Sequence, residues 1–169
     1  MSDVIFYLFG AIFIGIGATI IMDLWAIFLR KGFNISSLSF CLVGRWFSYM
    51  QDGIFRHDKI SSAEKRPAEC AIGWTAHYLI GIAYAFLLVI PASGAWLVSP
   101  SLLPALILGV ATVVFPFFMM QPAFGFGIAG AKTPNPVQAR VKSVMNHAVF
   151  GAGLYLSAIV FNYAMRGIG

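Results

Sequence analysis

The segment VIFYLFGAIFIGIGATIIMDLWAIFL, residues 4–29, is an apolar run in which Asp23 is the only charged residue. At a rise of about 1.5 Å per residue, an α-helix of this length crosses the roughly 30 Å hydrocarbon core of a bilayer. Residues 69–90, 101–125 and 144–165 form three more such segments. An α-helix satisfies its backbone hydrogen bonds inside lipid. The sequence therefore predicts an all-α membrane protein, a four-helix bundle in a single domain over residues 1–169.

The composition supports this fold class. Hydrophobic residues make up 60% of the chain and charged residues 10%, whereas a soluble domain carries about 25% charged residues. A water-soluble fold and a disordered chain are therefore excluded. The net charge of +5 does not indicate nucleic-acid binding, because the basic residues gather in two loops rather than along one solvated stripe.

Those two loops also predict how the chain is oriented. Residues 30–68 contain seven of the 11 Lys and Arg residues, and residues 126–143 contain three. The connector at residues 91–100 carries no charge, and the C-terminus adds only Arg166. Basic loops remain on the cytoplasmic side of a membrane. The expected topology is N-out and C-out, with both basic loops in the cytoplasm.

The long first loop is expected to contain more than a linker. Its stretch SFCLVGRWFSYM, residues 39–50, mixes aromatic residues with Arg45, a composition typical of an amphipathic segment lying in the headgroup layer. An irregular cytoplasmic loop is the alternative. Cys41 and Cys70 have no C-x-x-C spacing and fall in or beside this basic segment, so we expect free thiols on the cytoplasmic side. His57, between charged neighbours, is expected to be exposed to solvent.

Four polar residues lie inside the predicted spans near their cytoplasmic ends: Asp23, His77, Gln121 and His147. Helical rise places each of them roughly 5–12 Å inside the boundary. An ionisable group at such a depth costs about 2.5–3.5 kcal/mol and normally faces a partner in the bundle interior. We expect the four side chains to form one polar layer, with Asp23 paired to one of the histidines.

Three chemistries are compatible with this layer. An Asp–His pair on separate helices can bind and release a proton. The histidines His77 and His147 could instead hold a haem or a transition metal, although neither cofactor is favoured. A small organic ligand could be framed by aromatic residues, with Trp74 and Tyr78 lining the site. The alternative for each histidine is a purely structural hydrogen bond, and Asp23 could pair with Arg30.

The two halves of the chain resemble one another weakly. His77 and His147 are each followed four residues later by glycine, at Gly81 and Gly151, and then by a tyrosine. This pattern predicts a 2+2 parallel repeat, an arrangement known in transporters, with Gln121 in the place of Asp23. Pro116 and Pro122 each remove a helical donor, so Gln121 could alternatively mark a kink in the third span.

Several motifs together resemble one protein family: GRW at 44–46, GIFRH at 53–57, GWTAHYLIG at 73–81, PFFMMQPAFGFG at 116–127 and NHAVFGAGLY at 146–155. They are similar to DUF2938, a family of bacterial inner-membrane proteins of unknown function, over nearly the whole chain. The resemblance implies the four-span layout and a bacterial cytoplasmic membrane. It implies no activity and assigns no functional residue.

The function that the sequence favours is binding or transport of a small solute, an ion or a proton at the polar layer. One alternative is a non-catalytic accessory subunit that docks on a larger membrane complex, in which case the polar groups only join helices. A haem- or metal-bearing redox protein is another alternative. The expected partners are the lipid bilayer and either further copies of the chain or a larger complex, and no catalytic signature indicates an enzyme.

Overall fold

The computed structural model of the chain describes residues 3–91 and 94–166, apart from the side chains of Asp3 and Arg166. Within these residues every regular element is a helix. In chain order the elements are α1 (Asp3–Phe33), α2 (Phe40–Met50), η1 (Ile60–Ser62), α3 (Glu69–Val89), α4 (Ala95–Val98), α5 (Leu102–Ala111), the π turn η2 (Pro116–Met120), α6 (Gln121–Ala123), η3 (Ile128–Gly130) and α7 (Pro136–Arg166). The described residues therefore confirm the all-α class.

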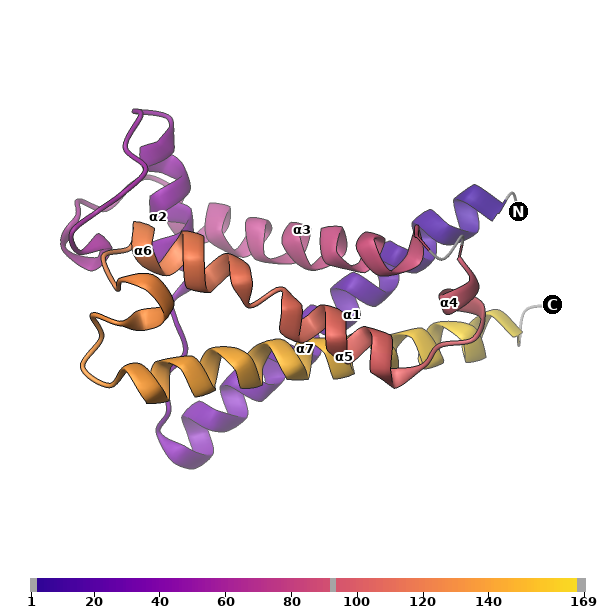
Figure 1. The fold of residues 1–169 in the computed structure, drawn as a ribbon. Helices are drawn as coiled ribbons and strands as arrows, with labels where there is room; N and C mark the ends of the chain where they lie inside the picture. Colours follow the sequence, from indigo (N-terminus) through magenta and orange to yellow (C-terminus); the bar gives the residue numbers. More distant parts are fainter. Residues whose placement is uncertain (1–2, 92–93, 167–169) are drawn as a thin grey trace.

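Four helices are long and apolar enough to cross a membrane, as the sequence predicts: Val4–Phe33, Glu69–Val89, Leu102–Ala123 and Pro136–Met165. The third of these is composite, because the π turn joins α5 to α6 around the two prolines. The described ends of α1 and α7 lie together at one end of the molecule (Figure 1). The opposite end, called the loop end below, contains α2, α6 and both basic loops, residues 30–68 and 126–143 (Figure 1).

The structure shows that the last long helix begins before the predicted span. We expected a loop over residues 126–143, but α7 begins at Pro136, so the last eight residues of that loop belong to the helix. The side-chain oxygen of Asn135 accepts a hydrogen bond from the backbone N–H of Gln138 at 3.1 Å. Asn is a favoured helix N-cap and Pro is favoured at the first helical position. This polar cap begins the helix eight residues before its apolar part, so hydropathy alone places the start too late.

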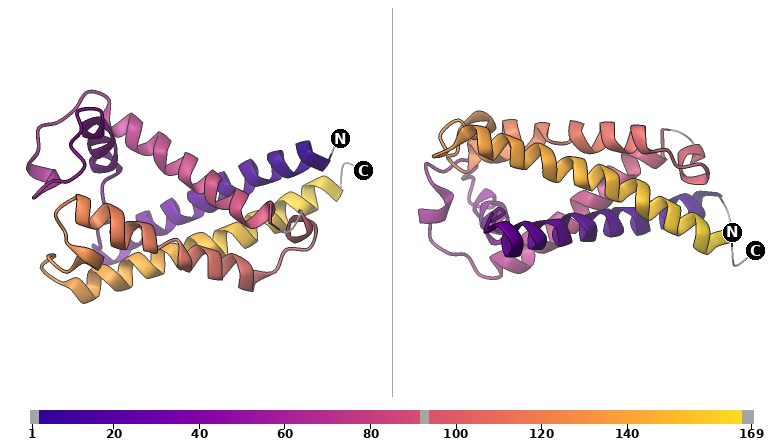
Figure 2. Two further views of the ribbon diagram at one scale, coloured as in Figure 1. Left: turned by 45° about the horizontal axis from the view of Figure 1, so that its top comes forward. Right: turned by 90° about the horizontal axis from the view of Figure 1, so that it is seen from below.

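Helices α1 and α7 pack against each other, with α3 packed on α1 and α5 packed on α7 (Figure 2). Glycines allow these close approaches, as small residues do between membrane helices. A Cβ atom on Gly15 would lie 2.6 Å from the Cα of Ile82 in α3. One on Gly153 would lie 2.9 Å from the Cα of Ala18, which fixes the register of α7 against α1.

An apolar cluster fills the loop end, formed around Trp46 of α2, Ile60 of η1 and Phe124 after α6. Backbone hydrogen bonds attach the first loop to the end of the third span. The N–H of His57 donates to Ala123 O at 2.8 Å, and that of Ile60 donates to Phe124 O at 3.2 Å. The first loop is thus a folded part of the protein, anchored on a span that follows it by about 60 residues in the chain.

The amphipathic segment SFCLVGRWFSYM forms the helix α2, and its buried residues, among them Val43 and Trp46, face the protein. Its place in the headgroup layer stays a prediction. Its backbone touches that of α3: a Cβ on Gly44 would lie 1.7 Å from Glu69 O. The expectation of free thiols is wrong, because this crossing brings Cys41 and Cys70 together in a disulfide, with a Cα–Cα distance of 3.9 Å. A separation of 29 residues in sequence carries no sign of that contact.

Candidate functional site

Asp23 of α1 is bonded through both carboxylate oxygens to side chains of α3. His77 Nε2 lies 3.0 Å from Oδ1, and the Tyr78 hydroxyl donates to Oδ2 at 3.0 Å. The side chains of His77 and Asp23 are only 9% and 17% exposed. The crossing at Gly15 and Gly81 positions the pair, because it brings α1 and α3 into contact two helical turns from Asp23. Asp23 was expected to pair with either His77 or His147, and the structure pairs it with His77.

Aromatic side chains cover this pair, which we call the Asp23–His77 site. The Phe40 ring, at the start of α2, stacks on the His77 imidazole with centroids 3.8 Å apart and planes inclined by 24°. Trp74 meets the same imidazole edge-on at 5.8 Å. Trp74 and Tyr78 line a shallow surface depression together with Thr75 and Leu79. The expected lining residues thus lie beside the site, and α2 closes its loop-end side.

His147 forms a separate hydrogen-bonded group between α5 and α7. Its Nδ1 lies 2.7 Å from the Thr112 hydroxyl, which donates to Gly109 O at 2.6 Å. A hydroxyl has one proton. With that proton on Gly109 O, the Thr112 oxygen is free to accept a hydrogen bond from an Nδ1–H of His147. This hydrogen bond is compatible with the structural role that is the alternative for His147, and that role stays a prediction.

Gln121 forms a third group with α7. Its side-chain amide donates to the Ser143 hydroxyl at 3.3 Å, and its buried Oε1 is without a hydrogen-bond partner. Asn146 Oδ1 and Trp25 Nε1 are likewise buried and unpartnered. Among the four residues of the expected polar layer, the structure joins only Asp23 and His77 by a hydrogen bond. His147 and Gln121 bind other residues.

Three of the four residues of the expected layer nevertheless lie at one level along the bundle. Measured from the contact of Ala18 with Gly153, Asp23 lies five residues along α1 and His147 six residues back along the antiparallel α7. Both displacements are about 8–9 Å toward the loop end. Asp23, and with it His77, therefore lies at the same level as His147, although α1 packs against α3 and α7 on different faces.

The parallel between the two halves is partly visible in the structure. His77 bonds to Asp23 of the preceding span, and His147 bonds to Thr112 of the preceding span. Gly81 and Gly151, four residues after each histidine, both lie in tight contact with that preceding span. Thr112, rather than the expected Gln121, thus takes the place of Asp23. The 2+2 repeat itself stays a prediction.

The described residues contain no group of three or more His, Cys, Asp or Glu side chains arranged to hold a metal ion. His77 lies on α3 and His147 on α7, and each is engaged by a residue of its own neighbouring helix. Neither arrangement presents a pair of free imidazoles to one bound group.

Sequence reasoning missed the ion pair that organises the loop end. Glu69 begins α3 and is buried, and its two oxygens each lie 2.8 Å from a nitrogen of Arg45. Arg45 also donates to Ala63 O at 2.9 Å. The sequence counts Arg45 among the loop cations, and only the isolated glutamate at the start of an apolar span could have signalled a buried partner.

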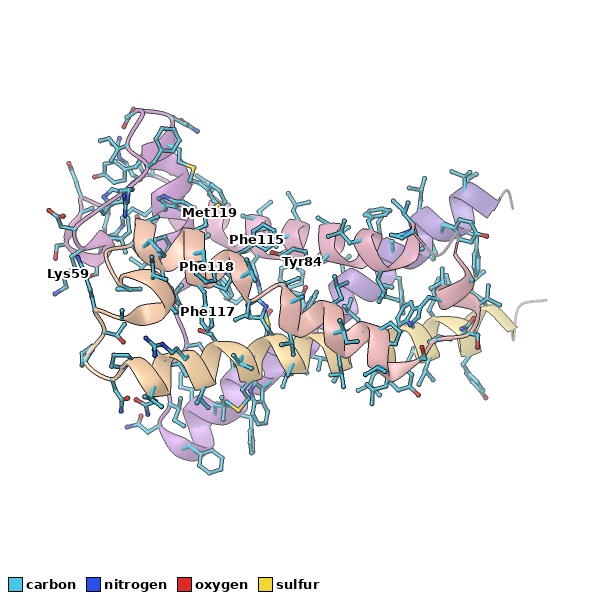
Figure 3. The ribbon with its side chains drawn as sticks, viewed as in Figure 1. Lys59, Tyr84, Phe115, Phe117, Phe118 and Met119 are labelled. Carbon is cyan, nitrogen blue, oxygen red and sulfur yellow. A yellow bond between two sulfur atoms is a disulfide. The ribbon has the colours of Figure 1, made fainter. Side chains whose placement is uncertain are left out.

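One aromatic contact joins the third span to α3 directly before the π turn. Phe115, directly before the turn, lies with its ring 5.7 Å from that of Tyr84 on α3 (Figure 3). A π turn shifts the helical register by one residue, and Gln121 follows it directly as a buried residue. The third span is therefore interrupted at the prolines by a π turn, and the buried Gln121 follows this turn directly.

His57 was expected to be exposed, but its Nε2 is buried without a hydrogen-bond partner. Its ring meets that of Tyr49 edge-on at 4.8 Å. Burial and the nearby positive charge of Arg45 lower the pKa of His57 below its usual range. The unfolded chain then binds a proton more readily than the folded chain at mildly acidic pH.

We therefore expect stability to fall as the pH is lowered from 7 through the ordinary histidine pKa of about 6.5 toward the lower folded-state value. His57→Phe retains the aromatic edge on Tyr49 and removes the titrating group. Its thermal unfolding midpoint, followed by tryptophan fluorescence, should fall less between pH 7 and pH 5 than that of the wild type. An equal fall of the unfolding midpoint with pH in the two proteins would show that His57 does not cause the loss of stability.

The family model described as "Protein of unknown function (DUF2938)" matches residues 12–161. This range contains Asp23, His77, the disulfide and the buried ion pair. No curated protein and no solved structure matches the chain.

Proposed function

The chain belongs to the DUF2938 family, whose function is unknown, and we therefore propose a role that rests on its own residues. The protein is an integral protein of a bacterial inner membrane. It binds or moves a small solute, an ion or a proton at a polar site between the spans, near the cytoplasmic face. The ligand that the geometry favours among these is the proton.

The proposed orientation is supported by the distribution of charge. Ten of the 11 Lys and Arg residues belong to the two loops at the loop end, where Lys59 marks the outer edge (Figure 3). Basic residues favour the cytoplasmic side of a membrane. The loop end then faces the cytoplasm, and the start of α1 and the end of α7 face outward.

The observation that carries the proposal is the bonding of Asp23 to His77 between two apolar helices. A carboxylate beside a neutral imidazole carries one negative charge, and uptake of one proton makes the pair neutral. Because an uncompensated charge is costly at this depth, the charged and the neutral state of the pair differ strongly in free energy. The Tyr78 hydroxyl holds the second carboxylate oxygen in place, so the proton exchanges at a fixed geometry.

Reconstituted vesicles test this function. A potassium diffusion potential is imposed, and an enclosed pH dye reports the entry of protons. Wild-type protein should raise the proton flux above that of protein-free vesicles, and Asp23→Asn should return it to the protein-free level, since the amide cannot take up the proton.

Asp58→Asn is the matched control, because Asp58 is an exposed carboxylate of the first loop, and it should leave the flux unchanged. Detergent-solubilised samples must elute as the wild type does, which separates loss of the site from loss of the fold. Equal flux in wild-type and protein-free vesicles, or an unaffected Asp23→Asn variant, would exclude proton movement at this site.

A further inference from the structure

The disulfide lies on the outside of the loop end. Cys41 is the second residue of α2 and Cys70 the second residue of α3. Cys70 is exposed to solvent and Cys41 is partly exposed. The bond therefore differs from the buried Arg45–Glu69 pair beside it, because a small molecule in water can reach it.

The compartment that the disulfide faces determines how it is expected to react. In the orientation proposed above, the loop end faces the cytoplasm, where disulfides in most organisms are transient, catalytic or redox-sensing. An accessible disulfide there is in contact with the thiol pool that keeps cytosolic cysteines reduced. A permanent structural bond is expected in the opposite, oxidising compartment.

The surroundings of Cys70 also favour exchange. Its sulfur lies at the N-terminus of a 21-residue helix, and the positive end of a helix stabilises a thiolate. Lys65 and Arg66 precede the helix, with Arg66 paired to Asp52. The neighbouring Glu69 carboxylate is neutralised by Arg45 of α2, and His77, further along α3, is bonded to Asp23. Lys65, which has no ion-pair partner among the described residues, supplies a positive charge close to the start of α3, with the exposed Glu64 next to it in sequence.

We propose that Cys41 and Cys70 form a thiol–disulfide exchange site whose substrate is a small anionic thiol of the glutathione class. This inference rests on the proposed orientation for its place in the cell, but not on proton binding at Asp23. It gives a function to the exposed disulfide, which neither the sequence motifs nor the proton site explains.

The reaction balances without a further oxidant. The thiolate of the small thiol attacks the exposed Cys70 sulfur, a mixed disulfide forms there, and Cys41 leaves as a thiolate. A second small thiolate then attacks the small-molecule sulfur of that mixed disulfide, and Cys70 leaves as a thiolate that the helix N-terminus stabilises. Two small thiols are oxidised to their disulfide, the protein disulfide is reduced, and the two protons pass to Cys41 and Cys70.

Single-cysteine variants of the purified protein test the site by mass spectrometry after acid quenching. With oxidised glutathione, Cys41→Ser should form a mixed disulfide at Cys70 on the order of tenfold faster than Cys70→Ser forms one at Cys41, because both cysteines lie at helix N-termini but Cys70 is exposed and Cys41 only partly exposed. Wild-type protein in mixtures of reduced and oxidised glutathione should change its disulfide fraction with the ratio of the two.

The charge preference is tested with a second thiol. Glutathione, which is anionic, should react with the wild-type disulfide faster than cationic cysteamine at equal thiolate concentration. Lys65→Gln should lower the glutathione rate severalfold and leave the cysteamine rate unchanged or raised. Equal rates for the two thiols would overturn the anionic substrate, and a disulfide that resists glutathione until the protein is unfolded would overturn the exchange site.

The location is tested separately with a membrane-impermeant maleimide on sealed vesicles of known orientation. Labelling of Cys70 in Cys41→Ser only when the cytoplasmic face is outside supports the proposed side. Labelling from the opposite face would overturn the cytosolic exchange reaction. Neither the mass spectrometry nor the labelling depends on Asp23. The exchange site and the proton site can therefore be refuted independently.

Discussion

Replacement of Arg45 by methionine is expected to destabilise the protein by about 3–5 kcal/mol, the usual effect of removing one member of a buried ion pair. The side chains of Arg45 and Glu69 are only 6% and 11% exposed. The hydrogen bond from Arg45 to Glu69 raises the pKa of the guanidinium, so the arginine stays charged at every working pH. Methionine would leave the Glu69 carboxylate buried and uncompensated, with Ile60 O and Ala63 O deprived of their donor.

The free energy of unfolding in mixed micelles measures this loss. The double variant Arg45→Met/Glu69→Met removes both charges and should recover a large part of the stability, since an apolar pair of similar volume can replace a buried ion pair. Arg56→Met is the matched control at an exposed loop arginine, with an expected change within about 0.5 kcal/mol. An Arg45→Met variant as stable as that control would show that the pair does not hold the loop end together.

Replacement of Gly73 by alanine is the second change with a large expected effect. The added Cβ would lie 1.8 Å from Phe40 O and 2.9 Å from Gly44 N, both backbone atoms of α2. Backbone cannot move aside as the tip of a side chain can, so α2 must shift away from α3. We expect a loss of about 3 kcal/mol, the upper part of the range for overpacked sites.

Two measurements follow this displacement. The free energy of unfolding should fall, and the fraction of molecules with the Cys41–Cys70 disulfide should fall with it, because the same crossing brings the two cysteines together. Gly32→Ala is the control: its Cβ would meet nothing closer than 4.0 Å, and alanine favours a helix. Wild-type stability and full disulfide formation in Gly73→Ala would mean that α2 does not rest on α3 as described.

Hydropathy predicts the four long helices because each needs a length of apolar residues set by the bilayer. It also leads to the Asp23–His77 pair, since a charged residue in such a helix needs a partner. It does not predict which faces meet. Successive residues of a helix differ by about 100° around its axis, so a small change of register decides whether His147 meets Asp23 or, as the structure has it, Thr112.

The disulfide and the buried ion pair also depend on which helix faces meet. Both follow from one crossing of α2 over α3 at Gly44 and Gly73, and glycines in an apolar sequence do not reveal which other glycine they touch. The early start of α7 has a local cause, the Asn135 cap, and that signal was available in the sequence NPVQ at 135–138.

The packing of α1 against α7 has a consequence for biogenesis. Helix α1 packs mainly against α7, which begins about 100 residues later in the chain, so residues such as Gly17 and Ala18 stay without these native contacts until Ser157 and Gly153 have been synthesised. Translation at about 5–20 residues per second leaves a nascent half-bundle of α1 and α3 waiting for several seconds. A chain stopped before Pro136 would keep that seam open to lipid, where quality-control proteases of the membrane find their substrates.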